Sequence, residues 1–296
     1  EGVDVAVDLM YLGGYSDVST KCTTYFNDGT LPCMTIAYPD TVADFIKNFG
    51  EKYVVNFDDY MDDKEIGFGT DRYLGDTKGK SDIIRTYLEE GQNFTIDGTF
   101  SLPFMKSSEV MLYNLDAATE IMRVYNNEAV QNGKVEETIS KFSWYDLISF
   151  CECALENKNL FPTMKYPLMY DSDSNLFITQ MYQEGYEYSS IKDGKGVIGF
   201  DDGGVNYNGA KSLLNEYKQW HDSGLFATKG SEGTYSSNSF KSGECIFVIG
   251  SSGGAGYTFP ATDSINLGVS MVPARNNTEY YISQGPSISF LRNPTF

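Results

Sequence analysis

The chain has 296 residues, which is enough for one large or two medium domains. Its 41 acidic and 22 basic residues give a net charge of −19, which argues against binding to nucleic acid or to an anionic membrane surface, because both need a basic patch. Aromatic residues are abundant, with 22 Tyr, 19 Phe and 2 Trp, and no apolar run approaches the ~18 residues of a membrane span. Tyrosine offers a flat apolar face and a hydroxyl group, which suits sugar recognition as well as core packing.

Strands and helices are predicted to alternate through the first half of the chain, separated by glycine and proline signals. The predicted extended segments are 3–9, 33–37, 99–104 and 111–114. The predicted helices are 15–27, 40–48, 82–90 and 115–125, and the acidic, glycine-dotted stretch 57–80 is predicted to be a loop with short helical turns.

The two ends of the chain resemble interrupted domains. Residues 3–9 alternate like a strand that begins within a domain, without a charged and then apolar leader before it. Residues 282–291 form another predicted strand at the other end. We therefore expect a piece of a longer protein, truncated at both ends and missing the first strand and helix of its first domain.

The second half of the chain repeats the alternation. Ser143 is predicted to cap a helix that ends near Glu156, with Asp146 at its third position in a capping-box arrangement. Further helices are predicted at 175–184 and 208–222. Strand–helix alternation with long crossovers predicts an α/β fold with parallel-rich sheets.

The segment 240–256 carries the clearest functional signal. A tight turn at Gly243 precedes the continuous apolar run 245–249, which predicts a strand covered on both faces. The small-residue loop 250–254 then places hydroxyl groups and backbone amides at the carboxyl end of this strand. In open α/β sheets, ligands bind at that edge.

The same loop matches the G-x-S-x-G pattern of a nucleophilic serine. Such a serine needs a base, and the one histidine, His221, precedes the loop instead of following it. Gly254, Gly256 and Pro260 also interrupt the helix that the pattern requires. We therefore favour a loop that binds a ligand over a catalytic serine.

No metal or cofactor site is predicted. Residues 171–175 resemble the start of a calcium loop, but Leu176 and Tyr182 replace the expected Gly and Glu, so a capped turn into the next helix is favoured. Residues 194–199 match G-x-G-x-x-G without the required flanking strand and helix. The carboxylate pair of a glycoside hydrolase stays open, because none of the 41 acidic residues is marked by its context.

The five cysteines show no paired metal spacing. Cys151 and Cys153 lie two positions apart on a predicted helix and therefore face different directions, while Cys245 lies in a predicted buried strand. Cys22 and Cys33 are the candidates for a disulfide, and the sequence leaves open whether that bond forms.

Several short motifs resemble, in order, those of the extracellular solute-binding proteins of ABC transporters. The closest group is carbohydrate-binding family 1, which includes the glycerol-3-phosphate-binding proteins. The motifs are Gly14-Tyr15, Gly29-Thr-Leu-Pro32, the hinge-like segment 102–114, Phe240-Lys-Ser-Gly-Glu-Cys245, Gly250-Ser-Ser-Gly-Gly254, 267–273 and 284–288. Each motif is short, but their common order extends over nearly the whole chain.

This resemblance implies two α/β lobes of the type II periplasmic-binding-protein fold, which close on a ligand in an interlobe cleft. It divides the chain into a first lobe at 1–111, a second lobe at 112–269 and a return to the first lobe at 270–296. It implies ligand contacts at Tyr15, Ser107, Ser251 or Ser252, and Gly285. An acidic residue of the relatives is replaced here by Pro39, with Asp40 one position later.

The residues themselves suit a sugar or polyol, which needs hydroxyl and carboxylate partners together with an aromatic face. Such groups occur at predicted loops or helix starts at Tyr15, Tyr38, Asp40, Ser107, Trp144, Tyr170, Asp171 and Ser251, with Ser108, Ser252 and Gly253 beside them. Helix packing and capping are the favoured roles of Trp144, Tyr170 and Asp171, and loop hydroxyls can also act as turn formers.

We therefore predict a non-catalytic receptor of an ABC importer that binds a sugar or oligosaccharide between two lobes. Its partners would be that ligand and the permease subunits of the transporter, without nucleic acid or cofactor, and we expect a monomer. The resemblance implies an extracytoplasmic location, either lipid-anchored at the cell surface or periplasmic. Two alternatives stay open: a carbohydrate-active hydrolase with paired carboxylates, and a surface scaffold with a degenerate cleft.

Overall fold

The computed structural model describes residues 6–63, 65–67, 83–201, 203–259 and 265–293, and it divides the chain into two compact units. The first unit consists of Glu1–Lys106, Asp193–Lys195 and Gly285–Phe296, and the second of Ser107–Lys192 and Gly196–Gln284. Each unit has its own sheet and its own buried apolar cluster. We describe them in turn.

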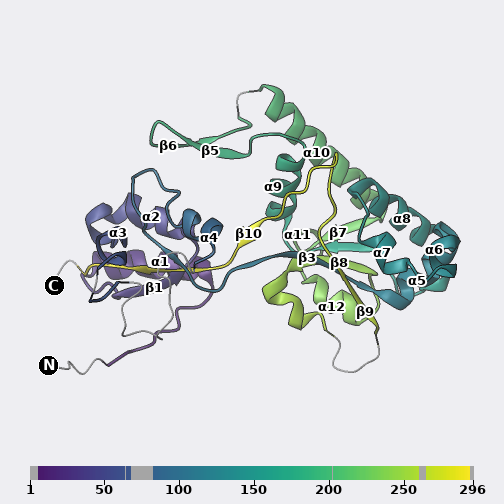
Figure 1. The fold of residues 1–296 in the computed structure, drawn as a ribbon, viewed down its shortest axis with the longest axis horizontal. Coiled ribbons are helices and arrows are strands. Elements are labelled where there is room, and N and C mark those ends of the chain that lie inside the picture. The colour runs from purple at the N-terminus through teal and green to yellow at the C-terminus, as the bar shows by residue number, and fades with distance from the viewer. Residues whose placement is uncertain (1–5, 64, 68–82, 202, 260–264, 294–296) are drawn as a thin grey trace. The chain divides into compact units, whose positions relative to one another are not determined.

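The first unit contains an antiparallel sheet with the strand order β1-β11-β2. Its strands are β1 (Met34–Ala37), β2 (Leu102–Pro103) and β11 (Ser287–Phe290). Its helices are α1 (Tyr15–Asn27), α2 (Pro39–Phe49), η1 (Glu51–Tyr53), α3 (Asp58–Met61) and α4 (Arg85–Glu90) (Figure 1). The antiparallel pairing brings the last described strand beside the first, because Met34 lies opposite Phe290.

Helix α2 supplies a large part of the first core because its apolar residues recur on one face. Val42, Phe45, Ile46 and Phe49 are buried at the spacing of an amphipathic helix. The ring of Phe49 stacks on Phe26 of α1 with the ring centroids 4.4 Å apart. Pro stands at the first position of this helix, where its missing N–H costs no hydrogen bond.

The second unit contains a mixed sheet with the strand order β10-β3-β8-β4-β7, and β9 pairs with β3. Its strands are β3 (Ser107–Asn114), β4 (Leu168–Tyr170), β7 (Phe226–Thr228), β8 (Phe247–Ser251), β9 (Leu267–Ser270) and β10 (Ser283–Gln284). Strand β4 runs parallel to both β7 and β8, whereas β3 runs antiparallel to β8. A separate hairpin joins β5 (Ser189–Lys192) to β6 (Lys195–Ile198).

Helices cover both faces of this sheet (Figure 1). Met111 and Tyr113 of β3 join the larger apolar cluster with α5 and α8, while Leu112 between them joins Phe240 on the opposite face. The helices are α5 (Leu115–Tyr125), α6 (Asn127–Gln131), α7 (Val135–Ile139), α8 (Trp144–Glu156), η3 (Lys158–Leu160), α9 (Asp173–Gln183), α10 (Val205–Asp222), α11 (Lys229–Glu232), α12 (Ser236–Lys241) and η4 (Ser252–Tyr257). The apolar run 245–249 is accordingly buried, as predicted.

Most of the predicted helices are confirmed, whereas several strands differ. Helices α1 and α5 have the predicted limits, and Ser143 caps α8 with Asp146 in the predicted capping box. The predicted strand 99–104 is only β2, and the described part of the predicted strand 3–9, residues 6–9, has no strand structure. Residues 3–5, 64, 68–80 and 82 of the predicted elements lie outside the described residues.

The unit boundaries also differ from the predicted lobe limits at 111 and 269. Residues 107–111 belong to the second unit because β3 is one continuous strand paired with β8. Residues 270–284 belong there as well, because Arg275 forms ion pairs with Glu184, directly after α9, and with Glu216 of α10, and because β10 pairs with β3.

All five cysteines are free thiols, so the candidate bridge between Cys22 and Cys33 is not formed. Cys22 is buried in the first core, whereas Cys33 is exposed. Burial raises the pKa of the Cys22 thiol, and a hydrogen bond with Thr35 partly opposes this effect.

Candidate functional site

The strand ends of the second unit bring several predicted site residues together. The parallel strands β4 and β8 end at the same edge of the sheet, and antiparallel β3 begins there. The Ser107 Oγ atom therefore lies 3.0 Å from Ser251 Oγ, within hydrogen-bonding distance. The backbone N–H of Ser108 donates to Ser252 Oγ at 3.2 Å.

The loop after β8 is more regular than the predicted small-residue loop. Strand β8 continues to Ser251, and η4 begins at Ser252. Ser251 Oγ accepts a hydrogen bond from the backbone N–H of Gly253 at 3.2 Å and so caps this short helix. A Cβ at Gly250 would lie 2.7 Å from Asp171 Oδ2, so a larger residue there would force the Asp171 side chain to shift.

The partners of these serines are other hydroxyls and backbone amides, not a general base. His221 instead lies on α10, where its ring stacks on Tyr166 and its nitrogens lie 3.9 Å from Asp222 and 3.8 Å from Glu232. The one histidine of the chain is therefore engaged elsewhere and is not paired with Ser251 or Ser252, as a serine nucleophile would require.

The acidic residues after β4 cap neighbouring backbone. Asp171 Oδ1 accepts from the backbone N–H of Ser236 at 2.8 Å, which is the favoured capping role. Asp173 accepts from the Thr228 hydroxyl and from the backbone N–H of Gly230. Ser172 Oγ caps α9, so the favoured capped turn at 171–175 is confirmed. Within the described residues, no cluster of His, Cys, Asp and Glu is arranged for a metal ion.

Trp144 and Tyr170 do not line this edge, and the prediction that they contact a ligand is wrong for this structure. Both side chains have 0% of their surface exposed. Trp144 stacks between Tyr170 and Trp220, with ring centroids 6.4 and 6.1 Å apart. Their aromatic area serves the core because the helix that begins at Trp144 packs directly on the sheet.

A buried carboxylate at the start of β3 escaped the sequence prediction. Glu109 is only 2% exposed, and it accepts hydrogen bonds from the Tyr170 hydroxyl and from Asn175 Nδ2, the latter at 2.9 Å. Burial raises the pKa of its carboxyl, the two hydrogen bonds lower it, and the nearby Asp171 raises it. The available signal was an acidic residue directly before the apolar run Val110–Tyr113.

Two exposed tyrosines follow strands of the same edge and were also missed. Tyr235, 54% exposed, immediately precedes Ser236, whose N–H bonds Asp171. Lys229 Nζ lies 3.8 Å from the Tyr235 ring centroid in a cation–π arrangement. Tyr257, 76% exposed, lies on η4 after the serines. Their position in segments that follow β7 and β8 is the sequence signal that could have found them.

The first unit has its own cluster of predicted site residues at the start of two helices. The rings of Tyr15 and Tyr38 meet edge to face with centroids 4.6 Å apart. Asp40 Oδ1 accepts from the backbone N–H of Thr41. Partial burial raises the pKa of Tyr38, and Tyr15 and Asp40 raise it further. Whether these side chains contact a ligand stays a prediction.

Gly285 is a conformational requirement of the first unit. Its φ of +110° is unfavourable for other residues, and an added Cβ would lie 2.1 Å from the Met105 carbonyl oxygen. We expect Gly285→Ala to lower the free energy of unfolding by roughly 1–3 kcal/mol in urea titrations. Gly256→Ala is the control, because its Cβ would meet no atom within 4 Å, and an equal loss in both variants would contradict the prediction.

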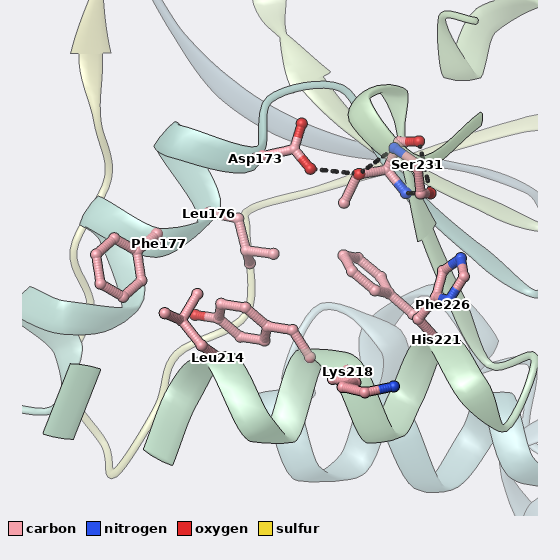
Figure 2. A pocket seen from close by; sticks show the side chains of 10 residues that line it. Asp173, Leu176, Phe177, Leu214, Lys218, His221, Phe226 and Ser231 are labelled. Atoms are coloured by element: carbon pink, nitrogen blue, oxygen red, sulfur yellow. Dashed lines mark hydrogen bonds between the residues drawn. The ribbon is translucent and has the colours of Figure 1, made fainter. Parts of the chain in front are cut away.

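A groove in the second unit offers a different kind of space (Figure 2). It lies between α9 and α10 beside β7, and it encloses about 630 Å³ when the part open to solvent is included. Ser231 Oγ on its rim donates to the Thr228 carbonyl oxygen, and the Thr228 hydroxyl donates to Asp173. The remaining wall combines the apolar or aromatic side chains of Leu176, Phe177, Leu214, Tyr217 and Phe226 with those of Lys218 and His221.

Solved structures of similar fold include proteins determined with a bound small molecule. The GacH receptor of Streptomyces glaucescens, solved with acarbose, has a TM-score of 0.64 and 18% identity, with coverage of 95% of this chain and 63% of that protein. UgpB of Mycobacterium tuberculosis, in complex with glycerophosphocholine, has a TM-score of 0.69 and 15% identity, with coverage of 98% and 65%. The chain thus spans less than two thirds of either protein, and the predicted two-lobe α/β fold is confirmed.

Sequence comparison leads to the same group. An uncharacterized lipoprotein of Mycoplasma pneumoniae is 33% identical over 104 residues, which cover 33% of this chain and 19% of that protein. Among the described residues, no helix combines the length and apolarity that crossing a membrane requires. Residues 1–288 match the family model of the bacterial extracellular solute-binding proteins, and the chain belongs to that family.

Proposed function

We propose that this chain is the sugar-binding part of an extracytoplasmic receptor that delivers its ligand to the permease of an ABC importer. The observation that carries the proposal is the edge of the second unit, where the hydroxyls of Ser107, Ser251 and Ser252 meet beside Asp171. Hydroxyl and carboxylate groups suit the many hydroxyls of a sugar.

Aromatic surface beside this edge adds to the argument. Tyr235 and Tyr257 are exposed there, and a flat ring can cover the apolar face of a pyranose. Tyr15, Tyr38 and Asp40 offer the same chemistry on the first unit. The ligand would then bind between the two lobes, and its contacts with both would shift an open–closed equilibrium.

Acarbose in the GacH receptor supports an oligosaccharide as the ligand class, and the lipoprotein relative supports a lipid-anchored receptor outside the cytoplasm. The net charge of −19 opposes anionic partners, so a neutral sugar fits better than a phosphorylated one. We propose a monomer that binds its ligand without chemical change.

Titration calorimetry and thermal unfolding with acarbose, maltose and glycerophosphocholine test this proposal. We expect saturable binding of a neutral saccharide, and we expect Tyr235→Ala to weaken it about tenfold, because a stacked aromatic ring contributes roughly 0.5–1.5 kcal/mol beyond its buried area. Tyr207→Ala is the matched control, since Tyr207 is a similarly exposed tyrosine on α10. Chromatography of the recovered sugar decides between receptor and hydrolase, and cleavage of maltose would overturn the proposal. Absence of binding across a wide sugar panel would favour a scaffold.

A further inference from the structure

Apart from the short stretch Asp193–Lys195 of the β5–β6 hairpin, which belongs to the first unit, the chain passes between the two units after Lys106 and after Gln284. On the second-unit side these points are neighbours, because β3 pairs with β10 and Ser107 lies opposite Gln284 (Figure 1). The Ser108 hydroxyl adds a bond to the Ile282 carbonyl oxygen at 3.1 Å. The start of β3 and the end of β10 are therefore joined where the chain enters and leaves the second unit.

One amide group of α9 holds both of these strands. Asn175 Nδ2 donates to Glu109 Oε1 at 2.9 Å and to Gln284 Oε1 at 3.2 Å. Glu109 is fixed in turn by the Tyr170 hydroxyl, which bonds its other oxygen. Because Glu109 is almost completely buried, its carboxylate depends on these donors in place of water.

The same asparagine belongs to the turn that follows β4 at the serine edge. Its backbone N–H bonds Ser172 Oγ at 3.2 Å, and Ser172 follows Asp171. A ligand that displaces Asp171 or the first turn of α9 would therefore move the Asn175 amide relative to Glu109 and Gln284. No second group on the described residues of α9 is hydrogen-bonded to both strands.

The first unit fixes its own side of the two crossings with a lysine. Lys106, whose side chain is 5% exposed, donates from Nζ to the Gly285 carbonyl oxygen at 2.9 Å and pairs with Glu90 at 2.5 Å. Part-buried polar contacts thus hold the chain on either side of the two crossings. A hinge built in this way needs few residues to change conformation.

We propose that Asn175 is a positioning residue that couples ligand binding at the serine edge to the two interunit crossings through Glu109 and Gln284. This inference rests on the proposed receptor function. It predicts that disturbing the Asn175 amide changes both the hydrogen-exchange protection of β3 and β10 and the affinity for sugar. Asn175 itself need not contact the ligand.

Asn175→Asp gives a readout that a purely structural asparagine would not give. The new carboxyl would face the Glu109 carboxyl, and two adjacent carboxyls share one proton at acid pH but repel each other when both ionise. The titratable groups that already act on Glu109 are Tyr170 of β4 and Asp171 after it, and burial has raised the pKa of Glu109. The variant should therefore keep the contact between residue 175 and Glu109 near pH 5, as in the wild type, and lose that contact near pH 8.

The experiment compares wild type, Asn175→Asp, Asn175→Leu and Asn215→Asp, the last on an exposed position of α10. Hydrogen exchange of residues 107–110 and 283–284 is measured against wild type at pH 5 and pH 8, and acarbose affinity is measured at both values. We expect Asn175→Asp to match wild type at pH 5, and at pH 8 to show faster exchange and roughly tenfold weaker binding, a typical size for coupling between sites. Asn175→Leu should be impaired at both pH values, and Asn215→Asp at neither.

The outcomes separate this inference from the proposed function. If wild type binds acarbose and Asn175→Asp shows no pH-dependent loss of acarbose affinity or of exchange protection relative to wild type, the proposed coupling is wrong while the receptor function stands. If wild type binds no sugar, the receptor function fails and the coupling fails with it. Hydrogen exchange would still show whether Asn175 stabilises the pairing of β3 with β10. Circular dichroism of Asn175→Asp at pH 5 confirms a folded chain before either comparison.

Discussion

Arg275→Met is expected to lower the free energy of unfolding of the second unit by about 3–5 kcal/mol, because it leaves two largely buried carboxylates without their partner. Arg275 is 5% exposed. It contacts Glu184 through Nε and Glu216 through Nη2, the latter at 2.6 Å. Its Nη1 also donates to Gln180 Oε1 at 2.9 Å, so each of the three guanidinium nitrogens has a partner in the network.

Urea unfolding at pH 7 measures this loss. Arg123→Met is the matched control, because Arg123 pairs with Glu120 at 3.3 Å on the surface, where both side chains are about half exposed. That pair should contribute less than about 1 kcal/mol. A similar small loss in both variants would show that the Arg275 network adds little beyond surface ion pairing.

The same network explains where the second unit ends. Arg275 lies between β9 and β10, whereas Glu184 follows α9 and Glu216 lies on α10. Gln183 adds bonds from its amide to the carbonyl oxygens of Pro273 and Tyr280. These contacts hold the returning segment in the second unit as far as Gln284, which is why a boundary drawn at 269 is too early.

The sequence predicted best those elements whose limits are set by nearby residues. Helix α8 is one example, since Ser143 and Asp146 form its cap within four positions. The short strand β10 could not be predicted in the same way. It exists because Ser283 and Gln284 pair with Ser108 and Ser107, more than 170 positions earlier, and such pairing has no local signal.

In the candidate site, too, some residues could be predicted from local sequence and others depend on contacts between distant positions. Ordered motifs pointed to Ser107 and Ser251, and their hydroxyls do meet in the structure, although ligand contact stays a prediction. Glu109 and Asn175 were missed because their bond joins positions 66 residues apart. Trp144 was included because an aromatic ring at a helix start suits either a ligand or a core, and only burial distinguishes the two.

Trp144→Ala is the second variant expected to have a large effect, with a loss of about 3–5 kcal/mol in the free energy of unfolding. The indole is fully buried between Tyr170 and Trp220, so its removal would leave a cavity that two stacked rings cannot easily fill. Leu214→Ala is the control, because Leu214 is a large apolar residue that is 54% exposed. We expect that substitution to cost less than about 0.5 kcal/mol.

Trp144→Phe separates the core role from the ligand role. Phenylalanine keeps an aromatic ring in the stack, and it removes an indole Nε1 that is buried without a hydrogen-bond partner in the described structure. If Trp144 serves the core, this variant should unfold at somewhat lower urea concentration and still bind acarbose within about twofold of wild type, since additivity holds for distant sites. Fluorescence from Trp220, the other tryptophan of the chain, follows its unfolding. A selective loss of acarbose binding in a stable Trp144→Phe protein would instead return Trp144 to the ligand site, and would require the helix start at Ser143 to open when sugar binds.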